Sequence, residues 1–226
     1  MSLLVKICGL KMPETLEAAL GAGADLVGFV FFPPSPRHVT DEAARTLGAV
    51  AAGRAIKVAL TVDADDRLLE RIVAVLRPDI LQLHGKESPE RVAAIKERFG
   101  LPVIKAIPVE VQADLGAMAA YVPVADRLLF DARAPREATR PGGLGRPLDW
   151  RLLQNVDPGI PFMLSGGLDA QNIGEALRLT RATAVDVSSG VEHAPGEKDT
   201  AKIRAFVRAA RNAAKSLSSP ALASSA

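Results

Sequence analysis

Cysteine, histidine and aromatic side chains are scarce in this sequence. Its 226 residues include one cysteine, three histidines and only 4% aromatic residues. A single cysteine excludes an internal disulfide and is typical of a protein from a reducing compartment. One cysteine and three dispersed histidines have no metal-ligand spacing, so we predict no metal site.

Blocks of like charge and long apolar runs are also missing. The formal net charge is +2, and neither basic nor acidic residues cluster along the chain, so the signature of a nucleic-acid or membrane-surface protein is absent. The opening MSLLVKICGL is interrupted too soon for a signal peptide, and no run reaches membrane-spanning length. We therefore expect a soluble, cytoplasmic protein without a nucleic-acid or membrane partner.

The sequence does contain a regular alternation of short β-rich runs and helical patterns, and its 48% hydrophobic residues can form a full core. Strands are predicted at Leu3–Cys8, Leu26–Phe32, Ile56–Val62, Ile80–His84, Val103–Ile107, Arg127–Asp131, Pro161–Ser165 and Ala184–Ser188. Helices are predicted at about Pro13–Ala22, Asp41–Ala52, Asp65–Leu76, Pro89–Phe99, Val111–Ala120, Asp149–Gln154, Asp169–Leu179 and Thr200–Lys215. Eight such units predict an α/β fold, a single-domain (β/α)8 TIM barrel, with a doubly wound open sheet as the alternative.

No internal boundary divides the chain, so we predict one catalytic domain over residues 1–215. Residues 216–226 read SLSSPALASSA, and this low complexity predicts a disordered C-terminal tail. The longest segment between predicted elements, Ala132–Leu148, is rich in Pro, Gly and Arg. Loops of that length in a compact domain are usually functional or disordered.

Side chains alternate between the two faces of a strand, so polar residues near strand ends should gather at the barrel mouth. The apolar residues of strand one alternate with Lys6 and Cys8, which turns these two inward. The predicted inward polar set is Cys8, His84, Lys105, Asp131, Ser165 and Ser188. Polar groups deep in a core would be costly without partners, so this set favours an active site at the mouth.

Turns rich in glycine and serine follow the last two strands, at Gly166-Gly167 and Ser188-Ser189. Each leaves backbone N–H groups unpaired where the chain turns, and such groups near a helix start attract an anion. We predict that these two turns bind the phosphate group of a substrate.

Cys8 suits a catalytic base or a small apolar core residue, and spacing alone leaves both open. A cation such as Lys6 beside the thiol would lower its pKa from about 8.5 toward neutrality. Asp131, at the tip of strand six, could serve as a general acid if burial raises its pKa. Its alternative is a structural carboxylate that pairs with an arginine such as Arg133. A thiol base and a carboxylic acid in one pocket suit a proton-shuttling isomerisation.

Two cationic side chains have a chemical and a structural interpretation each. Arg37 lies in a proline-stiffened loop and is a candidate clamp for a carboxylate, with a solvated loop arginine as the alternative. Lys105 is a candidate Schiff-base nucleophile of the aldolase type, or a lysine paired with an inward carboxylate. His84 is more typical of a hydrogen-bonded structural group than of a ligand.

An ordered set of motifs resembles the phosphoribosylanthranilate isomerase family of the tryptophan pathway. The match runs from Lys6 to about Phe206, over KICG at 6–9, GADLVGFVF at 23–31, SPRHV at 35–39, LQLHG at 81–85, LLFDA at 128–132, LSGGL at 164–168 and VDVSSGVE at 185–192. The resemblance implies a (β/α)8 barrel that acts on a small phosphosugar. It implies that the enzyme converts N-(5-phosphoribosyl)anthranilate into the 1-deoxyribulose 5-phosphate derivative by an Amadori rearrangement, without a cofactor.

Carried onto this sequence, the family's base falls on Cys8 and its acid on Asp131. Its anthranilate-binding arginine falls on Arg37, and its phosphate turns fall on Gly166-Gly167 and Ser188-Ser189. The loop after strand six departs from the family pattern, because Leu144 stands in GGLG where a serine or threonine is usual. That change removes a hydroxyl group from the loop and leaves its backbone N–H groups.

Three hypotheses for the function remain at the level of sequence. The first is the isomerase, the second is an enzyme that uses Lys105 chemistry in the same barrel, and the third is a phosphate-binding barrel without turnover. We expect the chain to be a monomer or a homodimer.

Overall fold

The computed structural model describes residues 3–135 and 137–218. Eight strands close into a barrel in the order β1 to β8, and every pairing around it is parallel. The strands are β1 Leu4–Cys8, β2 Leu26–Phe31, β3 Ile56–Thr61, β4 Ile80–Leu83, β5 Val103–Val109, β6 Arg127–Ala132, β7 Phe162–Leu164 and β8 Ala184–Val187. The predicted (β/α)8 barrel is confirmed, and the open-sheet alternative is wrong.

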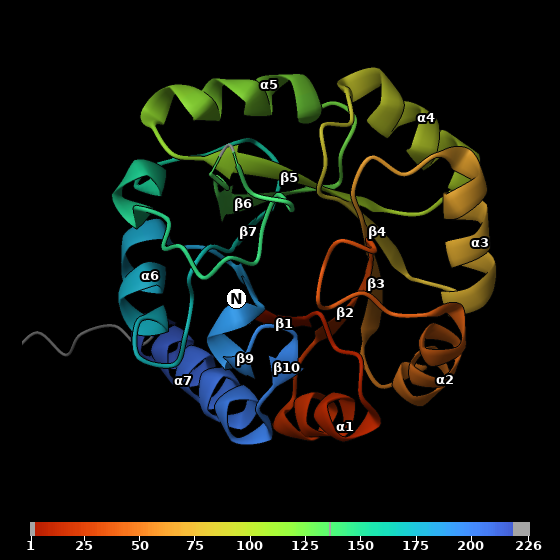
Figure 1. Cartoon of the computed structure of the whole chain (residues 1–226). Coiled ribbons are helices and arrows are strands. Elements are labelled where there is room, and N and C mark those ends of the chain that lie inside the picture. Colours follow the sequence, from red (N-terminus) through yellow and green to blue (C-terminus); the bar gives the residue numbers. More distant parts are fainter. Residues whose placement is uncertain (1–2, 136, 219–226) are drawn as a thin grey trace, which may run out of the picture.

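Helices surround the barrel between successive strands (Figure 1). They are α1 Pro13–Ala22, α2 Asp41–Ala51, α3 Asp66–Leu76, α4 Pro89–Phe99, α5 Met118–Tyr121, α6 Ile173–Thr180 and α7 Thr200–Ser218, with 3₁₀ turns η1 Gln112–Ala117, η2 Trp150–Leu153 and η3 Ser189–Val191. Three predicted helices differ from expectation, and one of them, predicted at Asp169–Leu179, begins four residues later as α6. The segment 111–120 divides into η1 and α5, and the segment 149–154 is the single 3₁₀ turn η2.

The helix ends follow from local sequence, as α4 illustrates. The Ser88 hydroxyl accepts a hydrogen bond from the backbone N–H of Arg91. Pro89 occupies the first turn, where a backbone N–H would have no partner within the helix, so the missing N–H of proline costs nothing. At the other end Gly100 adopts a left-handed φ of 62° and closes the helix. Strand β5 can therefore begin three residues later.

The core has two layers because side chains alternate along each strand. A large cluster fills the space between the strands and the helices. A smaller one fills the lower barrel interior and consists of Leu26, Val58, Ile104, Ala106, Leu129, Met163 and Ala184. Above it Cys8 packs with Val30 and Leu60.

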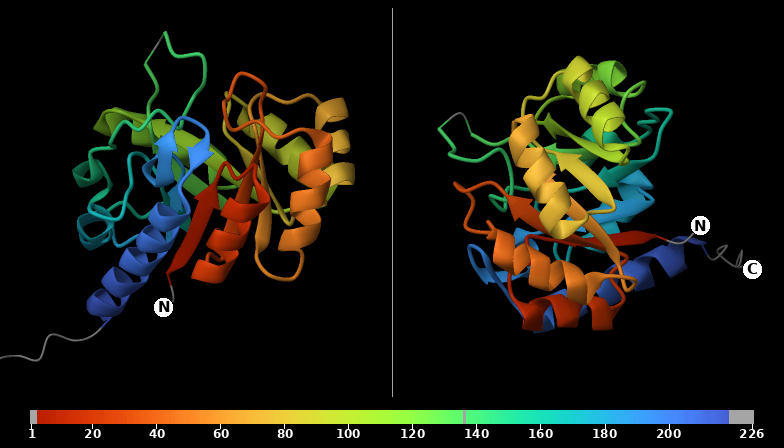
Figure 2. Two further views of the ribbon diagram at one scale, coloured as in Figure 1. Left: turned by 60° about the horizontal axis from the view of Figure 1, so that its bottom comes forward. Right: turned by 90° about the vertical axis from the view of Figure 1, so that its right-hand side faces the viewer.

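Three segments rise above the carboxyl ends of the strands (Figure 2). They are the loop after β2, the long connection between β6 and η2, and a hairpin of β9 Glu192–Ala194 and β10 Glu197–Lys198. The hairpin has no counterpart among the predicted elements, because its strands have only three and two residues. These segments form the rim of the mouth.

The C-terminal prediction needs one correction. Helix α7 continues to Ser218, so residues 216–218 are helical rather than part of a disordered tail. Residues 219–226 of the predicted tail lie outside the described residues. No helix in the described part of the chain combines the length and apolar character that a membrane crossing requires.

Candidate active site

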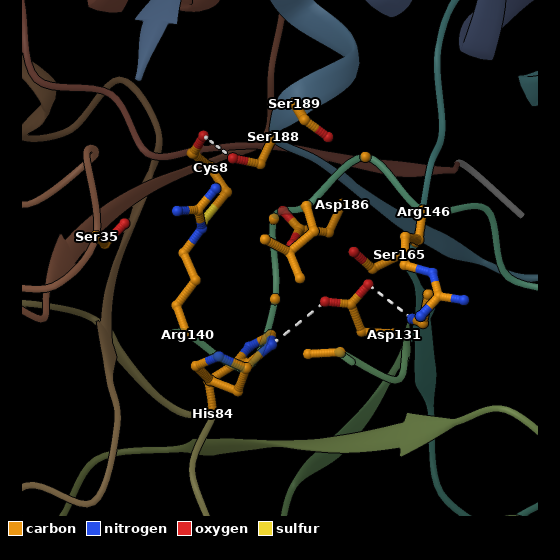
Figure 3. A pocket seen from close by; sticks show the side chains of 18 of the residues that line it. Cys8, Ser35, His84, Asp131, Arg140, Arg146, Ser165, Asp186, Ser188 and Ser189 are labelled. Carbon is orange, nitrogen blue, oxygen red and sulfur yellow. Dashed lines mark hydrogen bonds and ion pairs between the residues drawn. The ribbon is translucent and has the colours of Figure 1, made fainter. Parts of the chain in front are cut away.

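One pocket opens at the carboxyl ends of the strands. It is lined by residues from β1, β2, β3, β6 and β8, by residues that directly follow β2, β4 and β7, and by the connection after β6. Cys8 and Asp131 both line it and lie across it from each other (Figure 3). His84, Ser165 and Ser188 of the predicted inward set also line this pocket. The structure thus brings five of the six predicted inward polar residues together.

The thiol side of the pocket rests on a buried ion pair. Lys6 Nζ lies 2.9 Å from Asp186 Oδ1, and the strand register of β1 with β8 places the two residues side by side. Lys6 is completely buried and Cys8 is 3% exposed. A Cβ at Gly28 would lie 2.9 Å from Cys8 Sγ and 3.1 Å from Lys6 Nζ, so glycine makes room for both groups. Thiol and ammonium therefore share one small space in the barrel wall.

The expected lowering of the Cys8 pKa is wrong. Burial raises the pKa of the Cys8 thiol, and this effect outweighs the opposing attraction of Lys6; the negative charge of Asp186 adds to the increase. Burial by itself would lower the pKa of Lys6, but its contacts with Asp186 and Cys8 raise it overall. In the resting protein the ammonium is charged and the thiol keeps its proton at neutral pH.

The carboxylate side has different partners. Asp131 Oδ2 lies 3.3 Å from His84 Nε2, and Asp131 Oδ1 accepts a hydrogen bond of 2.9 Å from the backbone N–H of Ala132. On its other side, His84 Nδ1 lies 3.1 Å from Gln82 Nε2. In the tautomer in which Nδ1 accepts from the Gln82 amide, Nε2 carries the proton and faces Asp131. The alternative partner Arg133 instead contacts Asp114 at 2.6 Å.

Arg37 is buried rather than solvated, with 3% of its surface exposed. Its Nε and Nη2 each donate to a carboxylate oxygen of Glu192 at 2.7 Å, in a bidentate pair. The remaining nitrogen, Nη1, faces Gly143. A Cβ built on Gly143 would lie 2.4 Å from this nitrogen, which is too close for a side chain. The surface alternative for Arg37 is therefore wrong, and the guanidinium has one edge left for the pocket that it lines.

The two predicted phosphate turns lie together at the pocket. Gly166 and Gly167 have φ angles of 86° and 70°, which favour glycine, and a Cβ at Gly167 would lie 2.6 Å from Pro147 Cα. In the other turn, the Ser188 hydroxyl donates to the Cys8 carbonyl at 3.2 Å. A Cβ at Gly190 would lie 1.9 Å from Leu168 O, so the second turn packs directly against the chain that follows the first.

Lys105 contradicts the prediction of an inward side chain. In the sheet it is paired with Leu83 and Leu128, whose side chains belong to the outer core. Its ammonium donates to Glu87 Oε2 at 2.8 Å and to Gly85 O at 2.7 Å, and it does not line the pocket. The structural alternative, a lysine paired with an inward carboxylate, is right about the carboxylate partner and wrong about its side, because Lys105 and Glu87 pair on the outer side of the strand. A Schiff base on Lys105 in the barrel mouth is excluded by this orientation.

Sequence reasoning missed two arginines in the connection after β6. Arg140 and Arg146 both line the pocket. Arg140 Nε is buried without a hydrogen-bond partner, and burial together with the nearby charge of Arg37 lowers its pKa. Only the arginine-rich composition of this loop could have indicated them. In the described part of the chain no group of three His, Cys, Asp or Glu side chains is arranged to hold a metal ion.

A closed barrel that brings a thiol, a carboxylate and two glycine- or serine-rich turns to one mouth is typical of a (β/α)8 enzyme. A family model described as N-(5'-phosphoribosyl)anthranilate (PRA) isomerase matches residues 5–209. The chain belongs to this family, whose members are isomerases of tryptophan biosynthesis.

Individual relatives agree with the family model. The N-(5'-phosphoribosyl)anthranilate isomerase of Bradyrhizobium diazoefficiens is 65% identical over 211 residues, which cover 93% of this chain and 95% of the relative. That of Nitrobacter winogradskyi is 65% identical and covers 96% of each chain. The crystal structure of the Thermotoga maritima enzyme is 34% identical, has a TM-score of 0.84 and covers 93% of this chain and 99% of its own.

Two further solved structures describe a ligand and an assembly. One phosphoribosylanthranilate isomerase is in complex with reduced 1-(o-carboxyphenylamino)-1-deoxyribulose 5-phosphate; it is 32% identical, has a TM-score of 0.81 and covers 93% of this chain and 99% of that chain. The other, 31% identical with the same TM-score and coverage, is a monomer generated from the dimeric Thermotoga maritima enzyme.

Proposed function

We propose that this enzyme converts N-(5-phospho-β-D-ribosyl)anthranilate into 1-(2-carboxyphenylamino)-1-deoxy-D-ribulose 5-phosphate, with Cys8 as general base and Asp131 as general acid. The observation that carries the proposal is that these two side chains line one pocket from strands β1 and β6. An Amadori rearrangement needs an acid at one substrate atom and a base at the neighbouring carbon. The pocket holds one candidate of each kind on opposite sides.

The substrate carries two anionic ends, and the pocket has a place for each. We assign the phosphate to the backbone N–H groups of Gly166, Gly167, Ser188 and Ser189, because such turns bind anions without a charged side chain. We assign the anthranilate carboxylate to the free edge of Arg37. Holding both ends orients the ribose between Cys8 and Asp131, which lowers the entropic part of the barrier.

The chemistry then takes three steps. Asp131 donates its proton to the ribose ring oxygen, and the ring C–O bond breaks to give an iminium ion. Cys8 as thiolate removes the proton from C2, and the electron pair of that bond forms the enolamine. The enolamine moves a proton from the C2 hydroxyl oxygen to C1 and becomes the ketone. One proton enters at the ring oxygen and one leaves from C2, so the product is an isomer of the substrate.

The two groups therefore work with a single proton between them. The reaction starts from the form of the pair that has the proton on Asp131 and a thiolate at Cys8, and it ends with the proton on Cys8, the resting form that burial favours. Return of that proton to Asp131 through solvent restores the reactive form for the next turnover. The fixed ammonium of Lys6 offers the transient thiolate an adjacent positive charge. The Nε2–H of His84 faces the carboxylate that remains after Asp131 has given up its proton.

We further infer that the enzyme acts in the cytoplasm as a monomer or a homodimer, and that its partner is the small phosphosugar itself, without a cofactor. Cys8, Asp131, Arg37 and both glycine- and serine-rich turns line one pocket of a single chain, so we expect each chain to be active by itself. Gel filtration across a concentration series decides between monomer and dimer. Activity is predicted to be the same per chain at every concentration.

The test follows the loss of phosphoribosylanthranilate fluorescence by the wild type, Cys8→Ser and Asp131→Asn. Each substitution is expected to lower kcat by about 10²–10⁴-fold, the usual contribution of a general acid or base. Substrate KM should change little, because neither group holds an anionic end. If Asp131→Asn stays near the wild-type rate, the acid assignment is wrong, and a nearly active Cys8→Ser removes the base assignment in the same way.

A further inference from the structure

A buried chain of charges runs between the two proposed anchor sites. Lys198 Nζ contacts Glu192 Oε1 at 2.8 Å, and Glu192 holds Arg37 by two hydrogen bonds of 2.7 Å. The same ammonium donates to Ser188 O at 2.8 Å and contacts Ser188 Oγ at 3.1 Å. The Lys198 side chain is 1% exposed, and those of Glu192 and Arg37 are 4% exposed. Neither Lys198 nor Glu192 has a part in the proposed proton transfers.

We propose that Lys198 is a positioning residue that couples the two substrate anchors, holding the Ser188 turn directly and Arg37 through Glu192. The inference rests on the proposed function, because it concerns the groups assigned there to the phosphate and the carboxylate. The proposed phosphate site and the proposed carboxylate site are then not independent of each other. One ammonium sets the geometry of both.

The β9–β10 hairpin supports this assignment, because its register places Lys198 opposite Glu192. Its turn also contacts the loop that carries Arg37. Gly196 has a φ of 83°, and a Cβ there would lie 2.5 Å from Pro36 O, so the hairpin backbone packs against the residue before Arg37. The barrel closes without this hairpin. Its contacts instead join β8 and the loop after β2.

The charge balance of the chain also favours anion binding. The ammonium of Lys198 has three hydrogens, and its three contacts are all with Ser188 and Glu192. One carboxylate between two cations leaves a net positive charge, and the Arg140 guanidinium adds another beside Arg37. A neutral residue at position 198 would leave Glu192 to neutralise Arg37 alone. The carboxylate anchor would then weaken at the same time as the Ser188 turn loses its support.

The experiment measures binding of two half-ligands, sulfate for the phosphate turns and anthranilate for Arg37, by calorimetric or NMR titration. Lys198→Met keeps an unbranched side chain that is one atom shorter and removes its charge. We expect both dissociation constants to rise by about tenfold, as for the loss of one charged hydrogen-bonding partner. Lys96→Met, which removes an exposed lysine of α4 paired with Asp126, is the matched control and should leave both constants unchanged.

Arg37→Met shows whether any change in the pocket weakens both probes. It should raise the dissociation constant for anthranilate and leave that for sulfate within about twofold of the wild type. A Lys198→Met protein that weakens only one probe, or neither, overturns the proposal. If the wild type binds both probes and Lys198→Met changes neither, only the coupling fails. If the wild type binds neither probe and does not isomerise phosphoribosylanthranilate, the proposed function fails.

A pH series on a protein that keeps Lys198 gives a second test, which does not depend on how Lys198→Met folds. Burial lowers the pKa of Lys198 to about 8, despite the opposing attraction of Glu192. The charged groups that face it are Glu192, Arg37 and the Cys8 thiol, so the series uses Cys8→Ser to remove the thiol. Sulfate and anthranilate affinities should fall together above pH 8. Constant affinities up to pH 9.5, or a fall in only one, contradict the coupling.

Discussion

The two sides of the mouth hold their reactive groups in different ways. Beside Cys8, the Lys6–Asp186 pair is fixed by the register of two barrel strands and has no solvent contact at the ammonium. Beside Asp131, the partner is an imidazole at 3.3 Å, and the covering connection after β6 is rich in Pro, Gly and Arg. The charge beside the proposed base belongs to two barrel strands, whereas the imidazole beside the proposed acid directly follows the end of β4.

Breaking the thiol side should therefore cost stability as well as rate. Lys6→Met leaves Asp186 as an unpaired buried carboxylate, which is expected to lower the free energy of unfolding by about 3–5 kcal/mol. Urea denaturation followed by circular dichroism measures the change. The exposed pair broken by Lys96→Met should contribute only about 0–1 kcal/mol. If Lys6→Met and Lys96→Met lower the free energy of unfolding by similar amounts, the buried Lys6–Asp186 pair stabilises the fold no more than an exposed ion pair does.

Removing the His84 contact with Asp131 should lower kcat and change the free energy of unfolding little. His84→Asn removes the Nε2–H that faces Asp131 and is expected to lower kcat by about tenfold, the value of one hydrogen bond to a charged group. His193→Asn is the matched control, because His193 is 57% exposed and pairs only with Glu197 near the rim. Steady-state fluorescence assays compare the two. Unchanged kcat in His84→Asn would show that Asp131 needs no imidazole beside it.

The covering loop should have the smallest effect. Arg140 lines the pocket but makes no hydrogen bond at its buried Nε. Arg140→Leu removes a positive charge beside Arg37 and is expected to raise KM about two- to fivefold with kcat preserved, as for a partly solvated charge. The KM and kcat of this variant are read from the same assay. A large fall in kcat would give the loop a role in proton transfer that the proposal does not include.

The sequence carried enough information for the barrel and for the pair across its mouth. Period-two alternation turned both Cys8 and Asp131 inward, and each stands at the end of a strand, where a parallel barrel gathers functional groups. Helix boundaries such as Ser88 and Gly100 followed from capping chemistry, which is local in sequence. Features set by neighbours within a few residues were therefore predictable.

Features set by distant partners were not. Lys105 was expected inward because it is the polar residue of its strand, yet its partner Glu87 lies in a preceding loop on the outer face. The Cys8 pKa depends on burial from several strands, which no local pattern gives. Glu192 and Lys198 pair across a hairpin of two very short strands. Such strands have too few residues to show an alternation.

The most direct test of the account uses the fact that Cys8 is the only cysteine of the chain. The pH dependence of iodoacetamide alkylation then reports this thiol alone, and burial predicts a midpoint above its ordinary value of about 8.5. If Cys8 and Asp131 share one working proton, kcat/KM must fall with pH through that same midpoint, because the doubly deprotonated pair has no acid. We predict that alkylation rises as kcat/KM falls, with a common pKa. A kcat/KM that is constant or rising while the thiol ionises would contradict the assignment.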